Sequence, residues 1–292
     1  MGEKDITEKI LFDYNDVFAD IFNALLFKGR QVIRPDDLEE APVFSGYIHK
    51  GRVHGQERDV TKFWKDGHIC LSLFGIENQT AVDPNIALRM ISYDGAAYRA
   101  QLSKKDQREY FPVVSIVLYF GEKHWDSAKS LKERLTIRPE LEPYVNDYKV
   151  QVFEIPYLEP EIVDSFHSDF RSVADYFVQV QKNKTYDGSQ QQLDHVWEVF
   201  NLMSALTGDE EFAHAGRLAS VQGGCSMFSI LGDIEARGKS EGKKEGIAEG
   251  EIIGESRMAE KVQKALQELI HSQQISKEAA AILQSVTQQT GA

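Results

Sequence analysis

The sequence predicts an α/β fold, a mixed sheet flanked by helices and followed by a C-terminal helical tail. Two strand-like runs, 56–64 and 68–79, flank residues 65–67, and a central Asp-Gly between such runs is a strong hairpin signal. A helical stretch at 85–102 leads into a nearly continuous apolar run at 111–121, typical of a strand buried on both faces. Strands and helices in this order predict a sheet with helices on its faces.

The elements that precede the hairpin are a helix and a short strand. A helix is expected over residues 5–27, because apolar side chains recur at helical spacing from Phe18 to Leu25. The chain then leaves the helix through Gly29. A short strand and a turn at Pro35 are expected next.

The elements that follow the hairpin begin with the helix at 85–102. Pro84 precedes this helix, close to the position that proline favours at a helix start. The apolar run at 111–121 ends on Gly121, and a further strand is expected at 148–158. From about residue 162 to 231 the chain is expected to be mainly helical, which completes a first domain over residues 1–231.

The composition changes after this domain. Glycine recurs every four residues from Gly238 to Gly254, and each glycine costs a helix interior about 1 kcal/mol relative to alanine. We therefore expect a flexible or marginally helical linker over 232–256, with a weak coiled coil or a partner-dependent helix as the alternative. An apolar stripe returns in the tail, 257–292, where a second short helix is expected near Ala279–Leu283. These tail helices are candidates for forming a homo-oligomer.

Charge and cysteine usage exclude several classes of protein. The 292 residues carry a formal net charge of -13, which argues against broad adhesion to nucleic acid or anionic membranes but allows a local basic groove. Cys70 and Cys225 form no CxxC pair, and the eight histidines show no metal-binding spacing. No signal peptide or membrane-spanning run is evident. We expect a cytoplasmic protein.

The strand at 68–79 carries the candidate chemistry. Side chains alternate across a strand, so Leu73, Gly75, Glu77 and Gln79 share one face. Glu77 and Gln79 emerge together at the strand end, where ligands bind in open α/β sheets. Asp59 lies on the preceding strand-like run.

The hairpin register decides whether Asp59 reaches Glu77. A two-residue turn places Asp59 opposite Phe74 and on the other face of the sheet, because one residue of register reverses every side chain. A three-residue loop pairs Lys65 with Ile69 and places Asp59 diagonal to Glu77, with the Cα atoms roughly 7–8 Å apart. We therefore predict the longer loop or a bulge.

Two carboxylates at this separation can share one divalent cation such as Mg²⁺, which takes oxygen ligands. The alternative interpretation is that Glu77 ends an exposed strand and that Asp59 is an ordinary surface carboxylate. The residues alone leave both interpretations open, because strand carboxylates are commonly exposed to solvent.

The pattern of Asp59, hairpin, apolar strand and Glu77-Asn78-Gln79 resembles the PD-(D/E)XK nuclease motif, in the variant with glutamine in place of lysine. More narrowly, the chain is similar to the recombination-promoting nuclease / putative transposase family of bacteria over roughly residues 10 to 230. Five segments in order support this similarity: NDVFADIFNALLF (15–27), IENQT (76–80), ALRMISYDGAAYRAQL (87–102), FPVVSIVLYFG (111–121) and HWDSAKSL (124–131).

The resemblance implies a restriction-endonuclease-like core and a metal-dependent DNA endonuclease associated with recombination or mobile DNA. Asp59 and Glu77 would hold Mg²⁺ or Mn²⁺, which polarises a phosphodiester and lowers the pKa of an attacking water. Gln79 would position that water by hydrogen bonding, but it brings no charge. The alternative is a catalytically degenerate nuclease fold that serves binding or assembly.

The resemblance also implies roles for residues on two helices. Asp20, and less favourably Asp16, are candidates for an additional acid from the first helix, on a face that is expected to point away from the apolar stripe; solvated helix acids are the alternative. Arg89, on the helix after Glu77, could contact a DNA phosphate, or it could pair with Asp94 or another acid.

Overall fold

The computed structural model describes residues 10–41, 44–49, 52–57, 59–67, 69–103, 109–222 and 226–272, and the single residues 276, 279 and 282. The chain divides into two compact units, Met1–Leu231 and Gly232–Ala292, which are described separately below. Within the described ranges, no helix has both the length and the apolar character that crossing a membrane requires.

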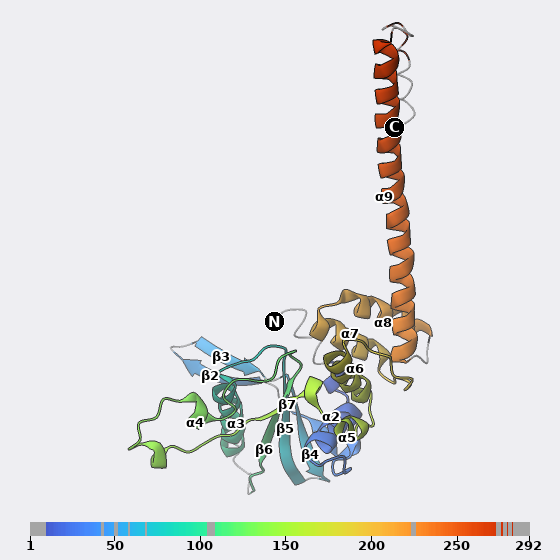
Figure 1. Ribbon diagram of the computed structural model, residues 1–292. Coiled ribbons are helices and arrows are strands. Elements are labelled where there is room, and N and C mark those ends of the chain that lie inside the picture. The colour runs from blue at the N-terminus through green and yellow to red at the C-terminus, as the bar shows by residue number, and fades with distance from the viewer. Residues whose placement is uncertain are drawn as a thin grey trace. The chain divides into compact units, whose positions relative to one another are not determined.

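The first unit is built on a five-stranded mixed sheet with the strand order β1-β4-β5-β6-β7 (Figure 1). Antiparallel pairs join β1 to β4 and β4 to β5, whereas β5, β6 and β7 run parallel. The strands are β1 (Leu38–Glu40), β4 (Val60–Asp66), β5 (Ile69–Gln79), β6 (Val113–Tyr119) and β7 (Gln151–Glu154). The prediction of a mixed α/β sheet flanked by helices is therefore confirmed.

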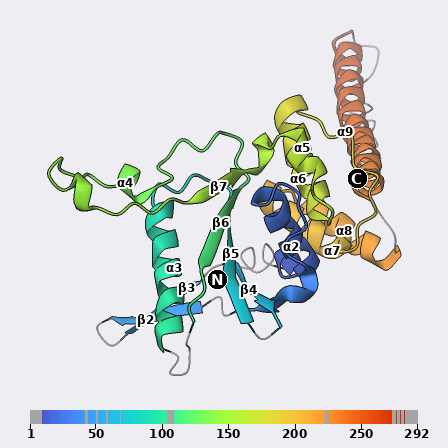
Figure 2. The ribbon, with the colours of Figure 1, turned by 90° about the horizontal axis from the view of Figure 1, so that it is seen from below.

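Helices cover the two faces of this sheet. Helix α3 (Ile86–Ser103) lies on one side of β4, β5 and β6, and α2 (Asn15–Leu25) lies with α5 (Pro160–Asp164) and α6 (Phe170–Asn183) on the other (Figure 2). The ring centroids of Phe22 and Phe74 are 4.5 Å apart, so Phe74 points toward α2. Because side chains alternate, Glu77 and Gln79 point toward α3.

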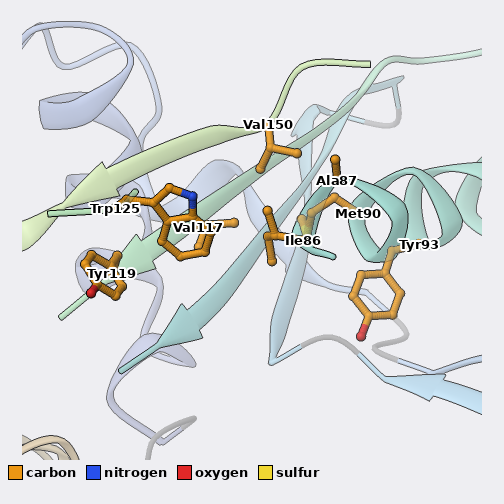
Figure 3. Packing of buried hydrophobic residues seen from close by; sticks show 8 residues of the cluster. All are labelled: Ile86, Ala87, Met90, Tyr93, Val117, Tyr119, Trp125 and Val150. Carbon is orange, nitrogen blue, oxygen red and sulfur yellow. The ribbon is translucent and has the colours of Figure 1, made fainter. Parts of the chain in front are cut away.

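A buried apolar cluster fixes α3 against the sheet (Figure 3). Helix α3 contributes one edge of the cluster, β6 contributes Val117 and Tyr119, and the segments around β7 complete it. The members are Ile86, Ala87, Met90, Tyr93, Val117, Tyr119, Trp125 and Val150. This packing positions the N-terminal half of α3 beside the carboxyl ends of the parallel strands.

Three features before β4 differ from the sequence predictions. Helix α2 begins at Asn15 after a break, and residues 5–9 of the predicted helix lie outside the described residues. The short strand follows Pro35 instead of preceding it, because Pro35 starts a 3-10 turn, Pro35–Asp37, that leads into β1. A separate hairpin of β2 (Phe44–His49) and β3 (Arg52–Glu57) was not predicted.

The second half of the first unit is largely helical, as its sequence predicted. The segment between β6 and β7 carries α4 (Leu131–Arg134) and the 3-10 turn η2 (Glu142–Tyr144). The 3-10 turn η3 (Ile155–Tyr157) follows β7. After α5 and α6 come α7 (Val196–Thr207) and α8 (Glu210–Gln222).

The glycine-rich segment lies inside a helix, α9 (Met227–His271), so it has the helical and not the flexible form of the two that its composition predicted. The helix hydrogen bonds of the main chain do not require a side chain, and the intervening Lys, Glu and Ala residues favour a helix. A Cβ atom at any position from Gly238 to Gly254 in the repeat would meet nothing within 4 Å. The short helix predicted near Ala279–Leu283 lies mostly outside the described residues.

Candidate metal and nucleic-acid site

A β-bulge sets the register between β4 and β5. Asp66 pairs with Ile69, which excludes the predicted three-residue loop, and Gly67 supplies the positive φ of +59° that the turn needs. The register then shifts between Trp64 and Lys65. The prediction of a longer loop or a bulge is therefore confirmed, because a bulge is present. The bulge shifts the register by one residue, which brings Asp59 to the face of the sheet that carries Glu77.

The bulge brings Asp59 beside Glu77. Val60 pairs with Ile76, so the same register carried one residue further places Asp59 directly opposite Glu77. This differs from the predicted diagonal position, in which Asp59 faced Gly75. The Asp59 Oδ2 atom accepts a hydrogen bond of 2.7 Å from the main-chain N–H of Asn78, which ties the carboxylate to the end of β5.

Glu77 is a buried carboxylate with polar partners on its own face of the sheet. Its side chain is only 4% exposed, and its Oε1 atom accepts hydrogen bonds from Arg89 Nη2 and, at 3.4 Å, from Gln79 Nε2. Gln79 is half-buried. The structure therefore contradicts the interpretation of Glu77 as a solvated strand end, because a carboxylate at this depth needs a compensating charge.

Arg89 supplies that charge from the first turns of α3. Its Nη1 atom donates to Asp83 Oδ2 at 2.8 Å, and its Nη2 atom lies 3.4 Å from the hydroxyl of Tyr93. Burial alone would lower the pKa of the Arg89 guanidinium, but Glu77 and Asp83 outweigh burial and raise the pKa above its ordinary value. Of the predicted alternatives, the structure shows Arg89 paired with acids.

Asp94, the other predicted partner of Arg89, has a different role. It is buried, and its two oxygens accept hydrogen bonds from Ser115 Oγ at 2.7 Å and from the hydroxyl of Tyr148. Asp94 therefore joins α3 to β6 and to the segment before β7. This contact keeps α3 close to the sheet at the level of the site.

The oxygen donors at this edge suit a hard divalent cation. Magnesium is commonly bound through one or two carboxylates while it keeps several waters, and Asp59 and Glu77 supply two carboxylates from adjacent strands. The Arg89 guanidinium already occupies the place of a counter-cation beside Glu77. Among the described residues, no group of three or more His, Cys, Asp or Glu side chains could hold a metal, so a cation at this edge would have only Asp59 and Glu77 as carboxylate ligands.

Asp20 lies elsewhere, on α2, where it faces the segment that precedes α6. It is 5% exposed, and its Oδ2 atom accepts hydrogen bonds from the main-chain N–H groups of His167 and Ser168, at 2.8 and 2.7 Å, and from Ser168 Oγ at 2.7 Å. The alternative interpretation of Asp20 as a solvated helix acid is therefore wrong. Its helix, α2, covers the face of the sheet opposite to α3 (Figure 2).

Asp16, one turn earlier on α2, is the exposed acid of the pair. Its side chain is 47% exposed, and its Oδ2 atom lies 3.2 Å from His195 Nε2. The His195 ring stacks on Tyr14, with ring centroids 3.7 Å apart. Asp16 therefore links α2 to the start of α7.

Two acids near the sheet edge were missed by sequence reasoning. Asp83 lies in the Asp-Pro-Asn segment before α3 and accepts the main-chain N–H of Asn85 at 2.8 Å, a local turn that its sequence could have indicated. Glu154 ends β7 and accepts hydrogen bonds from Lys129 Nζ and the Trp125 N–H, both at 2.9 Å. Burial raises the pKa of Glu154, but these donors outweigh burial and lower it.

Comparison with known proteins gives a family match for part of this chain. No curated protein and no solved structure matches the chain. Residues 65–207 match the family model described as "Putative transposase, YhgA-like". The match begins within β4 and includes Glu77, Gln79, Asp83, Arg89 and Glu154, whereas Asp20 and Asp59 precede it. The resemblance seen in the sequence is therefore confirmed over residues 65–207, which are similar to the YhgA-like putative transposase family.

Proposed function

We propose that this protein is a metal-dependent DNA endonuclease associated with mobile DNA. The family description points to proteins that act on mobile DNA. The observation that carries the proposal is the position of Asp59, directly before β4, beside the end of β5 that carries Glu77, where its carboxylate accepts the N–H of Asn78. This arrangement supports Mg²⁺ or Mn²⁺ as the cofactor and phosphodiester hydrolysis as the reaction.

Each residue of the site would have its own role in the reaction. Asp59 and Glu77 would hold the cation, which would polarise the phosphodiester and lower the pKa of an attacking water. The Gln79 carboxamide lies on the same face as Glu77 and would orient that water by hydrogen bonding. The Asn78 N–H keeps the Asp59 carboxylate in place. Arg89 is the cationic group nearest to where a phosphate would approach.

A plasmid-cleavage assay tests this proposal. The purified protein is incubated with supercoiled DNA and Mg²⁺, Mn²⁺, Ca²⁺ or a chelator. We expect cleavage with Mg²⁺ or Mn²⁺ that Asp59→Asn abolishes, because the amide oxygen can still accept the Asn78 N–H but the negative charge is lost. Asp66→Asn, at the exposed far end of the same strand, is the matched control and should cleave normally. Equal cleavage by both variants would refute the assignment.

A second candidate function is binding or assembly on a catalytically degenerate nuclease fold. Two observations favour it: Gln79 brings no charge, and Glu77 is already neutralised by Arg89. Calorimetry separates the candidates, because a degenerate protein should bind neither Mg²⁺ nor Mn²⁺. The variant Gln79→Lys adds the charge that the common motif contains. It should maintain or raise cleavage if Gln79 occupies the water-orienting position, and complete loss of cleavage would argue against that position.

A further inference from the structure

The Arg89 side chain lies between the buried carboxylate of Glu77 and the solvent. The Arg89 side chain is 38% exposed, whereas that of its partner Glu77 is 4% exposed. One end of the guanidinium therefore contacts the buried carboxylate while the group remains accessible from outside. A cation in this position neutralises Glu77 without closing the site.

A divalent cation and the guanidinium would compete for Glu77. Arg89 Nη2 and Gln79 Nε2 both donate to Glu77 Oε1, so the carboxylate already has a cationic partner. A metal ion bound between Asp59 and Glu77 would bring a second positive charge close to the guanidinium. Two positive charges that contact the same carboxylate repel each other strongly in a partly buried site.

Arg89 has a second anchor that would remain after it leaves Glu77. Asp83 Oδ2 accepts from Arg89 Nη1 at 2.8 Å, and Asp83 is itself held by the N–H of Asn85 through its other oxygen. The Arg89 guanidinium also lies 6.0 Å from the centroid of the Tyr93 ring. The guanidinium can therefore move away from Glu77 and still be paired with an acid.

We propose that Arg89 is an exchangeable counter-ion that couples metal binding to DNA binding. In the metal-free protein Arg89 neutralises Glu77. A divalent cation displaces the guanidinium, which stays anchored on Asp83 and is then available to a DNA phosphate. This inference rests on the proposed function, because it takes Asp59 and Glu77 as the metal ligands. It makes Arg89 a positioning residue whose partner depends on the metal.

The first test measures Mn²⁺ binding in the absence of DNA by calorimetry. We expect Arg89→Gln to bind Mn²⁺ more tightly than the wild type, by about 5- to 150-fold, the usual range of coupling between two sites. Arg134→Gln is the matched control, because Arg134 donates to Asn85 and makes no contact with Glu77 within the described residues. It removes the same charge and should change Mn²⁺ affinity by less than about twofold. Equal affinities of the two variants would overturn the exchange.

A second variant keeps the test decisive if Arg89→Gln does not fold. Arg89→Lys retains the charge but loses the planar fork that joins Glu77 to Asp83. Mn²⁺ should therefore displace it more easily than arginine, with an affinity between those of the wild type and Arg89→Gln. An affinity at or below the wild-type value would overturn the proposal.

The third measurement separates exchange from a purely structural role. Binding of a short duplex is followed by fluorescence anisotropy with Ca²⁺ and with chelator. Wild-type affinity for DNA should rise with Ca²⁺, and Arg89→Gln should lose that rise although it binds metal more tightly. A rise of the same size in both proteins would overturn the exchange.

The outcomes also distinguish this inference from the proposed function. If no protein cleaves DNA but Arg89→Gln binds Mn²⁺ more tightly, the cleavage proposal fails and the exchange stands. If the wild type cleaves DNA and Arg89→Gln gains no Mn²⁺ affinity, only the exchange fails. If neither protein binds Mn²⁺ at all, both proposals are overturned.

Discussion

Two buried carboxylates on opposite sides of the sheet are held in different ways. Asp20 and Glu77 are 5% and 3% exposed, so burial does not distinguish them. Asp20 accepts two main-chain N–H groups and one hydroxyl at the start of α6. Glu77 instead has a side-chain cation, Arg89, as its main partner.

The kind of donor indicates what each acid can do. Main-chain N–H groups are fixed by the fold, so a carboxylate oxygen that accepts two of them and a hydroxyl, as in Asp20, is held firmly between two segments. A guanidinium on a flexible side chain can leave when a better cation arrives. Asp20 therefore has the surroundings of a structural acid, whereas Glu77 has those of an acid that can change partner.

The largest expected effect contrasts the two acids in DNA cleavage. Glu77→Gln should reduce Mg²⁺-dependent cleavage by at least about 1,000-fold, because it removes the charge of a metal ligand. Asp20→Asn should stay within a few fold of the wild type, because its amide oxygen can still accept N–H donors. Cleavage rates are measured below the unfolding temperature of each variant. If Asp20→Asn lost as much cleavage activity as Glu77→Gln, Asp20 would be an acid of the site, and the distinction drawn between the two acids would be wrong.

The second expected effect concerns the free energy of unfolding. Asp20→Ala should lower it by about 3 kcal/mol, because buried N–H donors at the start of α6 lose a charged acceptor. Asp16→Ala is the matched control on the same helix. It should cost less than about 1 kcal/mol, because Asp16 is half exposed and its ion pair is near the surface. Urea unfolding measures both, and equal costs would show that Asp20 is not the anchor of this junction.

The difference between these two acids also shows what the sequence could predict. Glu77 could be placed on one face at a strand end, because alternation along β5 is a local property. A bulge could be predicted only as one of two ways in which Asp59 could reach the face of the sheet that carries Glu77. Its position between Trp64 and Lys65 depends on pairing along the whole hairpin.

The surroundings of Asp20 could not be predicted because its partners are distant in the sequence. Ser168 lies 148 residues away, and no local pattern in the first helix indicates that contact. The helical periodicity placed Asp20 off the apolar stripe, with a solvated acid as the alternative, but His167 and Ser168, which precede α6, contact it. The same limitation applies to Arg89, whose partner among several nearby acids is chosen by the packing of α3 on the sheet.

The smallest expected effect concerns Lys62, a buried cation on the α2 side of β4. Lys62 is 2% exposed, and its Nζ atom lies 5.9 Å from the centroid of the Phe18 ring. It forms no ion pair with the described residues, unlike Arg89 on the other side. Burial lowers the pKa of Lys62 from its ordinary value of 10.5, although Asp13 and Glu40 partly oppose this.

Lys62→Met should therefore stabilise the protein by about 1 kcal/mol at pH 7, because the burial penalty exceeds the attraction of the Phe18 ring. A lysine whose pKa is lower in the folded state weakens folding below that pKa. The penalty fades as the pH rises toward the unfolded value of 10.5, where both states lose the proton. The advantage of Lys62→Met in urea unfolding should shrink accordingly. Lys65→Met, at an ion-paired lysine on the same strand, should show no such advantage. A destabilised Lys62→Met, or an advantage that does not change with pH, would mean that the α2 side compensates its buried cation as fully as the α3 side does.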